Sequence, residues 1–444
     1  MILPITLIIL SGLIGLIWIS RHVQISLERK HGFILRETYE RGEGVSRGEG
    51  VSPACPAGVP LPAPGEDDST SSSGQPNGTH SAGETPAPRG TPAPPLISVV
   101  VAAKDEQDHI AACVESMLRQ DYPNVEIIVA NDRSTDRTAA IVAEIAARDP
   151  RVILLNIDHL PEGWGGKNHA MQHAVKRARG QWLCLIDADC TQTSTRTLTV
   201  ALAHAQDTRS DLLSLLPVLE MKGFWENTIQ PVCGGLMMIW FNPDKVNDPR
   251  RRNAYANGAF MLMRRATYDA IGTHAAVRGQ VNEDMHFAAL TKSGGHKLHV
   301  SRNEGLYTVR MYSSLKQMYR GWTRIFYGTF GSARRLILSL IVLLVVSMSP
   351  YFAAAAGFLT AALGGEHAEL WRTLGWVGLA TVVVQITVIY RFLKLLFGRP
   401  MFCLSYILGC FVTMLALIAA LGKLRKGATI MWRSTSHHAG TTGR

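Results

Sequence analysis

Charged residues are scarce in this sequence. Asp, Glu, Lys and Arg make up 18% of the 444 residues, whereas hydrophobic residues make up 47%. This balance is too apolar for an ordinary soluble protein and too charged for one that lies wholly within a membrane. The composition therefore indicates a soluble domain joined to membrane helices, and the length allows for both.

Cysteine motifs are lacking as well. The seven cysteines are odd in number and contain no Cys-x-x-Cys pair, so neither a disulfide framework nor a zinc site is indicated. We interpret them as reduced side chains of a protein that faces the cytosol.

Nucleic acid is not an expected partner. The net charge of +10 reflects 45 Lys and Arg against 35 Asp and Glu, but much of the excess lies next to apolar segments, as the positive-inside rule describes. A nucleic-acid binder would rest on charge alone and would show salt-dependent binding to DNA or RNA.

The first apolar run, residues 2–19, carries no charge and is long enough to span a bilayer. Basic residues follow this run, at Arg21, Arg29 and Lys30, and no Ala-x-Ala cleavage site comes after it. We therefore predict an uncleaved transmembrane anchor over residues 1–20, with the N-terminus outside and the next segment in the cytoplasm.

Residues 21–95 are interpreted as a juxtamembrane segment and a linker. From about residue 41 the composition shifts to Gly, Pro, Ser, Thr and Glu, and the hexapeptide RGEGVS occurs twice in tandem. Such a stretch cannot bury enough apolar surface to order itself, so we expect a disordered tether.

Short β-branched runs alternate with segments of helical length between residues 96 and 330. This pattern predicts an α/β fold with a mainly parallel sheet that is covered on both faces. Ligands of such sheets bind at the carboxyl ends of the strands, so functional residues should lie there. The predicted strands are 97–103, 125–131, 151–156, 182–187 and 211–217.

Three further apolar stretches lie within residues 336–421. We predict about three C-terminal transmembrane helices, the first of them kinked at Pro350. A third span would place the basic tail, residues 422–444, outside the cell, although its Lys and Arg residues prefer the cytoplasm. One stretch could instead lie in the interface or be re-entrant, so the number of spans and the side of the C-terminus stay open.

Acidic residues follow the first two predicted strands. Glu106 comes after the first strand and Asp132 after the second, so both should lie at the same edge of the sheet. Carboxylates there suit the imide and hydroxyl donors of a nucleotide. Asp132 and Ser134 could equally form a turn and a helix N-cap.

A glycine-rich loop, Leu160 to Asn168, follows the third predicted strand and leads into a helix. It carries Lys167 at the helix entrance, where backbone donors and a cation could bind a diphosphate. It is not a Walker loop, GxxxxGK[ST], because no glycine lies five residues before Gly166 and neither Ser nor Thr follows Lys167. A nucleoside triphosphatase is therefore not indicated.

The motif Asp187-Ala188-Asp189 emerges from the apolar strand WLCLI. Two carboxylates at that spacing could hold Mg²⁺ or Mn²⁺ against a diphosphate, and the metal would neutralise the charge on a departing nucleoside diphosphate. A solvated turn is the alternative for an isolated motif of this kind. The position at the carboxyl end of a central strand favours the metal site.

Glu283 and Asp284 open a predicted helix that ends at Gly294-Gly295. A carboxylate here could take the proton of an acceptor hydroxyl as that hydroxyl attacks. The alternative is electrostatic, because acids favour the first turn of any helix.

Gln317, Arg320 and Trp322 lie on or near a helix that enters the membrane. Arginine mixed with aromatic residues is typical of an interfacial belt. The same residues would also suit a substrate site, and the sequence favours neither interpretation.

Taken together and in order, the strand-end acid, ND-x-S-T-D, GW-x-GK, DAD, ED and Q-x-x-R-x-W resemble the motifs of membrane-bound family 2 glycosyltransferases with a GT-A fold. The resemblance covers about residues 96–330 and the anchor arrangement. Within the family, LPEGWGGK and the stretch from VRMYSSL to GWTRIFYG are most similar to enzymes that glycosylate lipids, the hopene-associated and diaponeurosporenoate glycosyltransferases.

The resemblance implies a GT-A domain, Rossmann-like in type, over residues 96–330 and a UDP-sugar as the donor. By position, Glu106 and Asp132 would hold the uracil and ribose, and Lys167 would lie near the nucleotide. Asp187 and Asp189 would bind the nucleotide and its divalent metal, Mg²⁺ or Mn²⁺.

The resemblance also implies inverting transfer with Asp284 as the general base, because one base and one in-line displacement invert the anomeric centre. Glu283, Gln317, Arg320 and Trp322 would lie on the acceptor or diphosphate side. The expected partners are a lipid acceptor, such as a polyisoprenoid, hopanoid or carotenoid-like lipid, and the bilayer. The expected location is the cell membrane, multi-pass, with the catalytic domain in the cytoplasm.

Two features depart from the family pattern. Asn131-Asp132 supplies one carboxylate where the family usually has two. Gly321 separates Arg320 from Trp322, whereas processive synthases carry Q-x-x-R-W, so Trp322 lies about 100° further round the helix. We interpret the extra glycine as evidence against processivity.

Two alternatives to a single-transfer enzyme remain. A processive polysaccharide synthase would need a polar channel, and the C-terminal stretches supply few polar residues besides Gln385. A non-catalytic membrane scaffold that binds a nucleotide-sugar as a sensor would keep its biological function when Asp284 is replaced by Asn.

Overall fold

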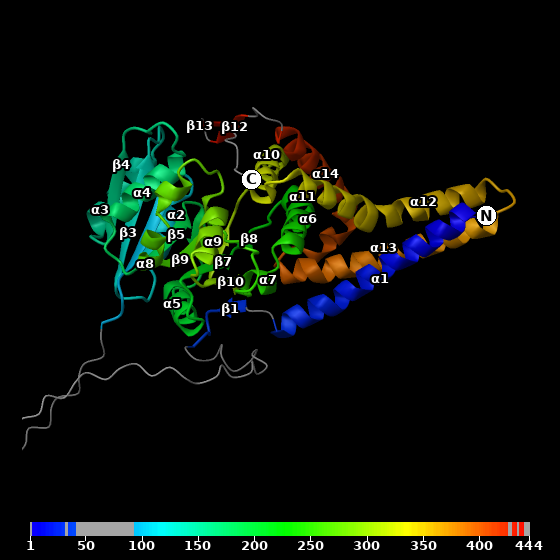
Figure 1. Ribbon diagram of the computed structural model, residues 1–444, viewed down its shortest axis with the longest axis horizontal. Coiled ribbons are helices and arrows are strands. Elements are labelled where there is room, and N and C mark those ends of the chain that lie inside the picture. Colours follow the sequence, from blue (N-terminus) through cyan, green and yellow to red (C-terminus); the bar gives the residue numbers. More distant parts are fainter. Residues whose placement is uncertain (1, 32–33, 41–92, 425–428, 433–434, 439–444) are drawn as a thin grey trace, which may run out of the picture.

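The structure is a computed structural model that describes residues 2–31, 34–40, 93–424, 429–432 and 435–438. Most of the predicted linker, Cys55 and part of the basic tail lie outside the described residues. The described part consists of a sheet domain and a group of long helices that extends from one side of it (Figure 1).

An eight-stranded sheet forms the centre of the domain, in the order β1-β10-β7-β9-β5-β2-β3-β4. Neighbouring strands are parallel except at β9, which is antiparallel to both β5 and β7. The predicted fold class, α/β with a mainly parallel sheet, is confirmed. The strands are β1 (Ile34–Arg36), β2 (Ile97–Ala103), β3 (Val125–Asp132), β4 (Val152–Ile157), β5 (Trp182–Asp187), β7 (Leu212–Leu216), β9 (Phe260–Arg264) and β10 (Leu298–Glu304).

The five predicted strands correspond to β2, β3, β4, β5 and β7, each within one residue of its predicted bounds. Strands β9 and β10 were not predicted, because their sequences, FMLMR and LHVSRNE, contain few β-branched residues. Tertiary pairing on both sides gives these two segments their extended conformation.

Strand β1 joins the sheet from outside residues 96–330. It pairs in parallel with β10, and the Nε atom of Arg36 lies 2.6 Å from Glu304 Oε2. The chain just after the first helix is therefore held at the edge of the sheet.

Helices cover both faces of the sheet, because alternate side chains of each strand point to opposite faces. Val99 and Val101 of β2 pack with α2, α3 and α5, whereas Val100 between them packs with α4 and α9. The helices are α2 (Ile110–Leu118), α3 (Thr138–Arg148), α4 (Gly166–Arg177), α5 (Thr197–Asp207) and α9 (Glu283–Ser293).

A small second sheet, in the order β6-β11-β8, follows the carboxyl end of β5. Strand β5 ends at Asp187 and β6 begins at Cys190, so Ala188 and Asp189 connect the two sheets. The strands are β6 (Cys190–Gln192), β8 (Val218–Leu219) and β11 (Tyr307–Val309).

Four helical segments among the described residues are long and apolar enough to span a membrane. A π-helical turn, Val342–Met348, interrupts the second segment two residues before Pro350, where the sequence predicts a kink. The segments are Ile2–Ile25 within α1 (Ile2–His31), Ala333–Ala362 with α11 (Ala333–Ile341) and α12 (Ser349–Ala362), Ala368–Leu395, which is α13, and Pro400–Lys423 with α14 (Tyr406–Lys423).

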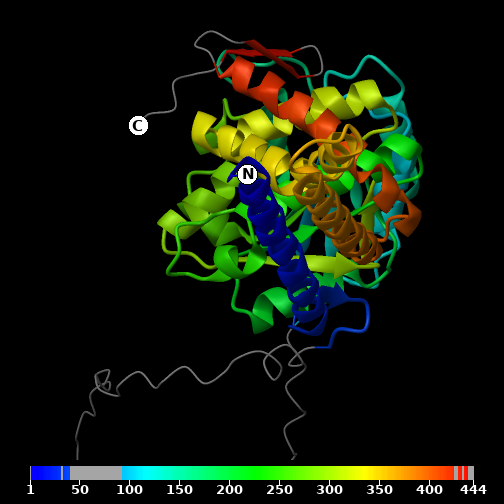
Figure 2. The same ribbon diagram turned by 90° about the vertical axis from the view of Figure 1, so that its right-hand side faces the viewer.

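The four segments differ in direction. Helices α1, α12 and α13 lie side by side and project away from the sheet domain, whereas α14 lies at an angle to them, nearer the sheet domain (Figures 1 and 2). Helix α14 packs against α6 (Phe224–Trp240) and α10 (Leu315–Phe330), which lie between the sheet domain and the bundle.

Candidate functional site

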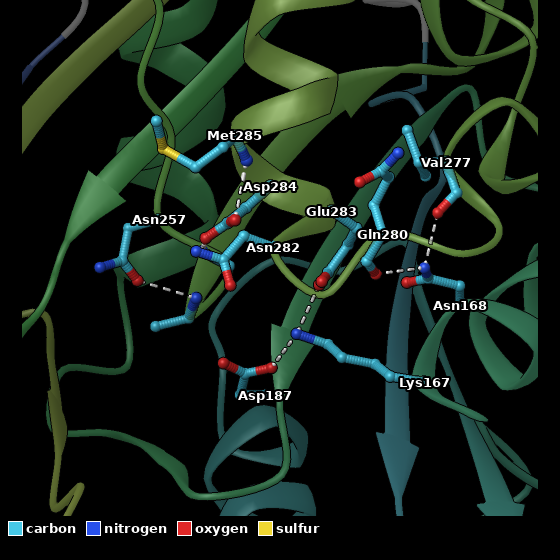
Figure 3. A network of polar contacts seen from close by, with 12 residues as sticks. Lys167, Asn168, Asp187, Asn257, Val277, Gln280, Asn282, Glu283, Asp284 and Met285 are labelled. Atoms are coloured by element: carbon cyan, nitrogen blue, oxygen red, sulfur yellow. Dashed lines mark hydrogen bonds and ion pairs between the residues drawn. The ribbon is translucent and has the colours of Figure 1, made fainter. Parts of the chain in front are cut away.

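Lys167, in the first turn of α4, lies at the centre of the site. Its Nζ atom is 2.6 Å from Asp187 Oδ1 and 2.6 Å from Glu283 Oε1 (Figure 3). The three residues come from α4, the end of β5 and the start of α9. The fold thus joins three motifs that are far apart in the sequence at the carboxyl edge of the sheet.

The positive charge of Lys167 is strongly favoured in this position. Burial lowers the pKa of its ammonium group, but the carboxylates of Asp187 and Glu283 outweigh burial and raise the pKa well above its ordinary value. The side chain is still 24% exposed. Lys167 is therefore a fixed cation that an anionic group of a ligand can reach.

Asp284 stands beside this ion-pair cluster and is held by two backbone hydrogen bonds. The Gly258 N–H donates to Oδ2 at 2.9 Å, and the Met285 N–H donates to Oδ1 at 2.7 Å. Desolvation and then the negative charge of Glu283 raise the pKa of Asp284 to about 7. A carboxyl group with this pKa can exchange a proton near neutral pH.

The loop before α9 is fixed by Asn168, the residue after Lys167. Its Nδ2 atom donates to the carbonyl oxygens of Val277 at 2.7 Å and Gln280 at 2.9 Å (Figure 3). The glycine-rich loop and the first turn of α9 are therefore held together twice, by Lys167 and by Asn168.

Asp132, at the end of β3, is 3% exposed and pairs with its neighbour. The Nε atom of Arg133 lies 2.8 Å from Asp132 Oδ1. A Cβ at Gly166 would overlap Asp132 Oδ2, so a larger residue here would displace that carboxylate. Asp132 thus lies against the N-terminus of α4, next to the residue that precedes Lys167.

Glu106 is also buried at this edge of the sheet, at 7% exposure. The loop that carries it is fixed by the preceding residue, because Asp105 Oδ1 accepts a hydrogen bond from the Thr135 N–H at 2.8 Å. Asp105 and Arg133 both have positive φ angles, 53° and 54°. Backbone strain at two neighbouring strand ends is a frequent feature of ligand-binding edges.

Asp189 is half-buried where the two sheets join, two residues beyond Asp187. Among the described residues, no three His, Cys, Asp or Glu side chains gather in a way that could hold a metal ion. The donor set still fits Mg²⁺ or Mn²⁺ bound with a nucleotide, because two carboxylates suffice when diphosphate oxygens complete the shell. The Asp187 side chain is 36% exposed and open to such a ligand.

Helix α10 separates the three residues predicted for it. Gln317 and Arg320 lie on its exposed face, and Gln317 Oε1 accepts a hydrogen bond from the Ser313 N–H at 3.0 Å. Trp322 is 5% exposed on the opposite side and contacts Phe326. Only Trp322 of the three faces the interior.

Gly258 is a site residue that sequence reasoning missed. A Cβ there would come within 3.3 Å of Lys167 Nζ and 3.5 Å of Asp284 Oδ2, so its backbone forms the floor between them. The available signal was the dipeptide Asn257-Gly258, which marks a turn. Nothing in that dipeptide indicates that the turn lies against residues far along the chain.

A mostly parallel sheet with these acids and this lysine at its carboxyl edge defines an α/β domain of the GT-A type. Residues 98–272 match the model of the family described as Glycosyl transferase family 2. The matched residues run from β2 to just beyond the helix Arg265–Ala270 and so lie within the sheet domain.

A similar curated protein is the 4,4'-diaponeurosporenoate glycosyltransferase of Staphylococcus aureus (strain MRSA252), which is 27% identical over 249 residues. The match covers 56% of this chain and 65% of the relative, slightly less than two thirds of its length.

Two solved structures have low sequence identity and low TM-scores with this chain. One is the mannosyltransferase PcManGT from Pyrobaculum calidifontis in complex with GDP-Man and Mn²⁺, with 18% identity, a TM-score of 0.42, and coverage of 65% of this chain and 86% of that one. The other is S. aureus TarS 1-349 in complex with UDP-GlcNAc, with 18% identity, a TM-score of 0.38, and coverage of 78% and 97%.

Proposed function

We propose that this protein is a membrane-anchored inverting glycosyltransferase that moves a single sugar from a UDP-sugar to a lipid acceptor. The observation that carries the proposal is Asp284, a carboxyl group with a pKa of about 7 beside the ion pairs of Lys167 at the carboxyl edge of the sheet. A base and a cation for a diphosphate are what such a transfer requires.

In the proposed reaction the acceptor hydroxyl oxygen attacks the anomeric carbon of the donor sugar. The O–H proton passes to a carboxylate oxygen of Asp284 as the new carbon–oxygen bond forms. The bond between the anomeric carbon and the diphosphate breaks, and its electron pair leaves with UDP. Because attack and departure are in line, the configuration of the anomeric carbon inverts.

The donor would lie along the carboxyl ends of β2, β3 and β5. Glu106 and Asp132 are buried carboxylates that suit hydrogen bonds from the uracil and ribose. The ammonium group of Lys167 would stabilise the negative charge of the diphosphate. A divalent metal held by Asp187 and Asp189 would supply further neutralisation of that charge when bound.

The lipid acceptor is proposed on two grounds. The sheet domain is attached to four segments able to span a membrane, which would bring an apolar acceptor to the site. The name of the similar S. aureus protein also refers to a carotenoid-type acceptor. We propose the cell membrane as the location, with the sheet domain on the cytoplasmic side.

The test is UDP release by detergent-purified protein with a panel of UDP-sugars, Mg²⁺ or Mn²⁺, and bacterial lipid extract. We expect one donor to give release that lipid stimulates and that Asp189→Ala abolishes. Asp269→Ala, at an exposed position on the helix Arg265–Ala270, is the matched control and should behave as wild type. UDP binding without release for any donor would instead support a nucleotide-sugar sensor.

A further inference from the structure

Two largely apolar cavities lie next to α6 and α13. The inner cavity, of about 190 Å³, is lined by residues of α6 and α10 and by Asn257. The outer cavity, of about 270 Å³, is lined by α1, α6, the π-helical turn and α13. Each exceeds the roughly 150 Å³ apolar cavity that is enough to bind benzene in another protein.

The two cavities share a wall. Pro231 and Met238 of α6 and Phe392 of α13 line both of them. Methionine is a flexible side chain that adapts to different neighbours. A chain-like molecule could therefore pass from one cavity to the other past Met238 and Phe392.

The lining of the inner cavity lies one residue from a hydrogen-bond partner of the proposed base. Asn257 lines the cavity, and the next residue, Gly258, donates its N–H to Asp284 Oδ2 at 2.9 Å. The outer cavity ends instead among Trp18 and Ile25 of α1 and Ile389 of α13, within the segments able to span a membrane. The lining of the inner cavity therefore comes within one residue of a hydrogen-bond partner of Asp284, and the outer cavity lies among the segments able to span a membrane.

Two buried polar side chains in the inner cavity are without hydrogen-bond partners in the described part of the chain. Gln230 is 1% exposed with both amide atoms unpaired, and Trp322 is 5% exposed with Nε1 unpaired. Burial of unpaired polar atoms in a largely apolar cavity is costly unless a ligand binds them. The amide can donate and accept, whereas the indole can only donate, so together they suit an oxygen atom that carries or accepts a proton.

We propose that the two cavities form one passage for a single-chain lipid with a terminal oxygen. Its head lies in the inner cavity, hydrogen-bonded by Gln230 and Trp322 next to Asn257. Its hydrocarbon tail crosses the wall at Met238 and Phe392 into the outer cavity. This inference deepens the proposed function and rests on it for the identity of the lipid as the sugar acceptor.

Two glycines of α6 that line the cavities have room for a Cβ atom, so they are suitable positions at which to block the passage. A Cβ at Gly234, in the inner cavity, would meet no atom within 4 Å. A Cβ at Gly235, in the outer cavity, would meet only Phe392 at 3.9 Å, an ordinary contact. Leucine at either position fills the passage, and leucine also favours the helix more than glycine does.

The first experiment measures equilibrium binding of radiolabelled farnesol, an isoprenoid alcohol, to the full-length protein in detergent. We expect saturable binding that Gly234→Leu and Gly235→Leu each weaken about tenfold, equivalent to losing the burial of two methylene groups. Gly12→Leu on α1 is the matched control, since a Cβ there also meets nothing within 4 Å. Wild-type binding in both blocking variants, or no saturable binding at all, would overturn the passage.

A second arm tests the polar head. Gln230→Leu should weaken farnesol binding about tenfold, the effect of one hydrogen bond, and leave the binding of farnesol methyl ether less affected. Equal effects on both compounds would show that Gln230 does not hydrogen-bond the polar head of the lipid.

Transfer assays separate this inference from the proposed function. With an active wild type, the kcat/KM ratio of farnesol over isopentenol should fall about tenfold in Gly235→Leu, as binding of the longer chain weakens. If farnesol binds as expected but no sugar is transferred to any alcohol, the passage stands and the proposed transfer fails.

Discussion

At the carboxyl edge of the sheet, Lys167 contacts two carboxylates and Asp284 accepts two backbone hydrogen bonds. In the inner cavity nearby, the amide of Gln230 and the indole of Trp322 have no partner in the described part of the structure. The first cluster is already organised without a ligand, as electrostatic catalysis requires. The second is complete only when a ligand supplies the missing hydrogen bonds.

The largest expected effect comes from removing the base at the organised edge. Asp284→Asn should lower kcat about 10²–10⁴-fold, because the amide cannot accept the acceptor proton. Donor affinity, measured by UDP binding, should be retained, because Asp284 is not one of the residues proposed to hold the nucleotide. Asp269→Asn is the exposed control. Unchanged turnover in Asp284→Asn would exclude this residue as the base.

Removing the charge of Lys167 should have the next largest effect, on stability and on UDP affinity. Lys167→Met leaves the carboxylates of Asp187 and Glu283 close together without their cation, so we expect the free energy of unfolding to fall by about 1–3 kcal/mol. UDP affinity should fall as well. Denaturant unfolding and UDP titration measure both, with Lys167→Arg as the variant that keeps the charge. Equal stability of the Met and Arg variants would show that the ion pairs contribute nothing.

The pH dependence of turnover tests the raised pKa of Asp284. A base must be deprotonated, so kcat/KM should fall about tenfold per pH unit below pH 7 and level off above it. Stopped assays across this range give the profile, and UDP binding over the same range serves as the control. A profile that is flat down to pH 5 would contradict a pKa of about 7.

The smallest expected effect is on stability and comes from a change in the inner cavity. It is a gain, whereas Lys167→Met is expected to cause a loss. Gln230→Leu removes a buried amide that lacks partners, so the lipid-free protein should gain about 1 kcal/mol of stability. Gln120→Leu is the matched control and should destabilise the protein. The Gln120 Nε2 atom donates to Ser194 O at 2.8 Å, and its Oε1 atom accepts from the Leu198 N–H at 3.0 Å. Thermal unfolding in detergent compares the two. Destabilisation by both would show that Gln230 has a structural role.

Some of the site was predictable because strand position fixes it. Glu106, Asp132 and Asp187 follow buried parallel strands, and parallel strands place their carboxyl ends at one edge. The pairing of Lys167 with Glu283 was not predictable, since 116 residues separate them. Gly258 was missed for the same reason, because a turn dipeptide carries no information about its distant neighbours.

The membrane helices were also predictable only in part. Apolar runs predicted an N-terminal anchor and about three C-terminal segments, and four segments able to span a membrane are present among the described residues. Hydropathy could not indicate that α14 lies at an angle to the bundle of α1, α12 and α13 (Figure 2). Its packing against α6 and α10 depends on contacts between helices from distant parts of the chain.

The sequence by itself determined the fold class, the positions of five strands and the order of the chemical motifs, because hydrophobic period and turn residues act over short stretches of chain. The tertiary structure alone decided which charges meet, which polar groups are left unpaired, and that two cavities lie next to α6 and α13. Those properties depend on distance and burial in three dimensions, and residues remote in the sequence set both.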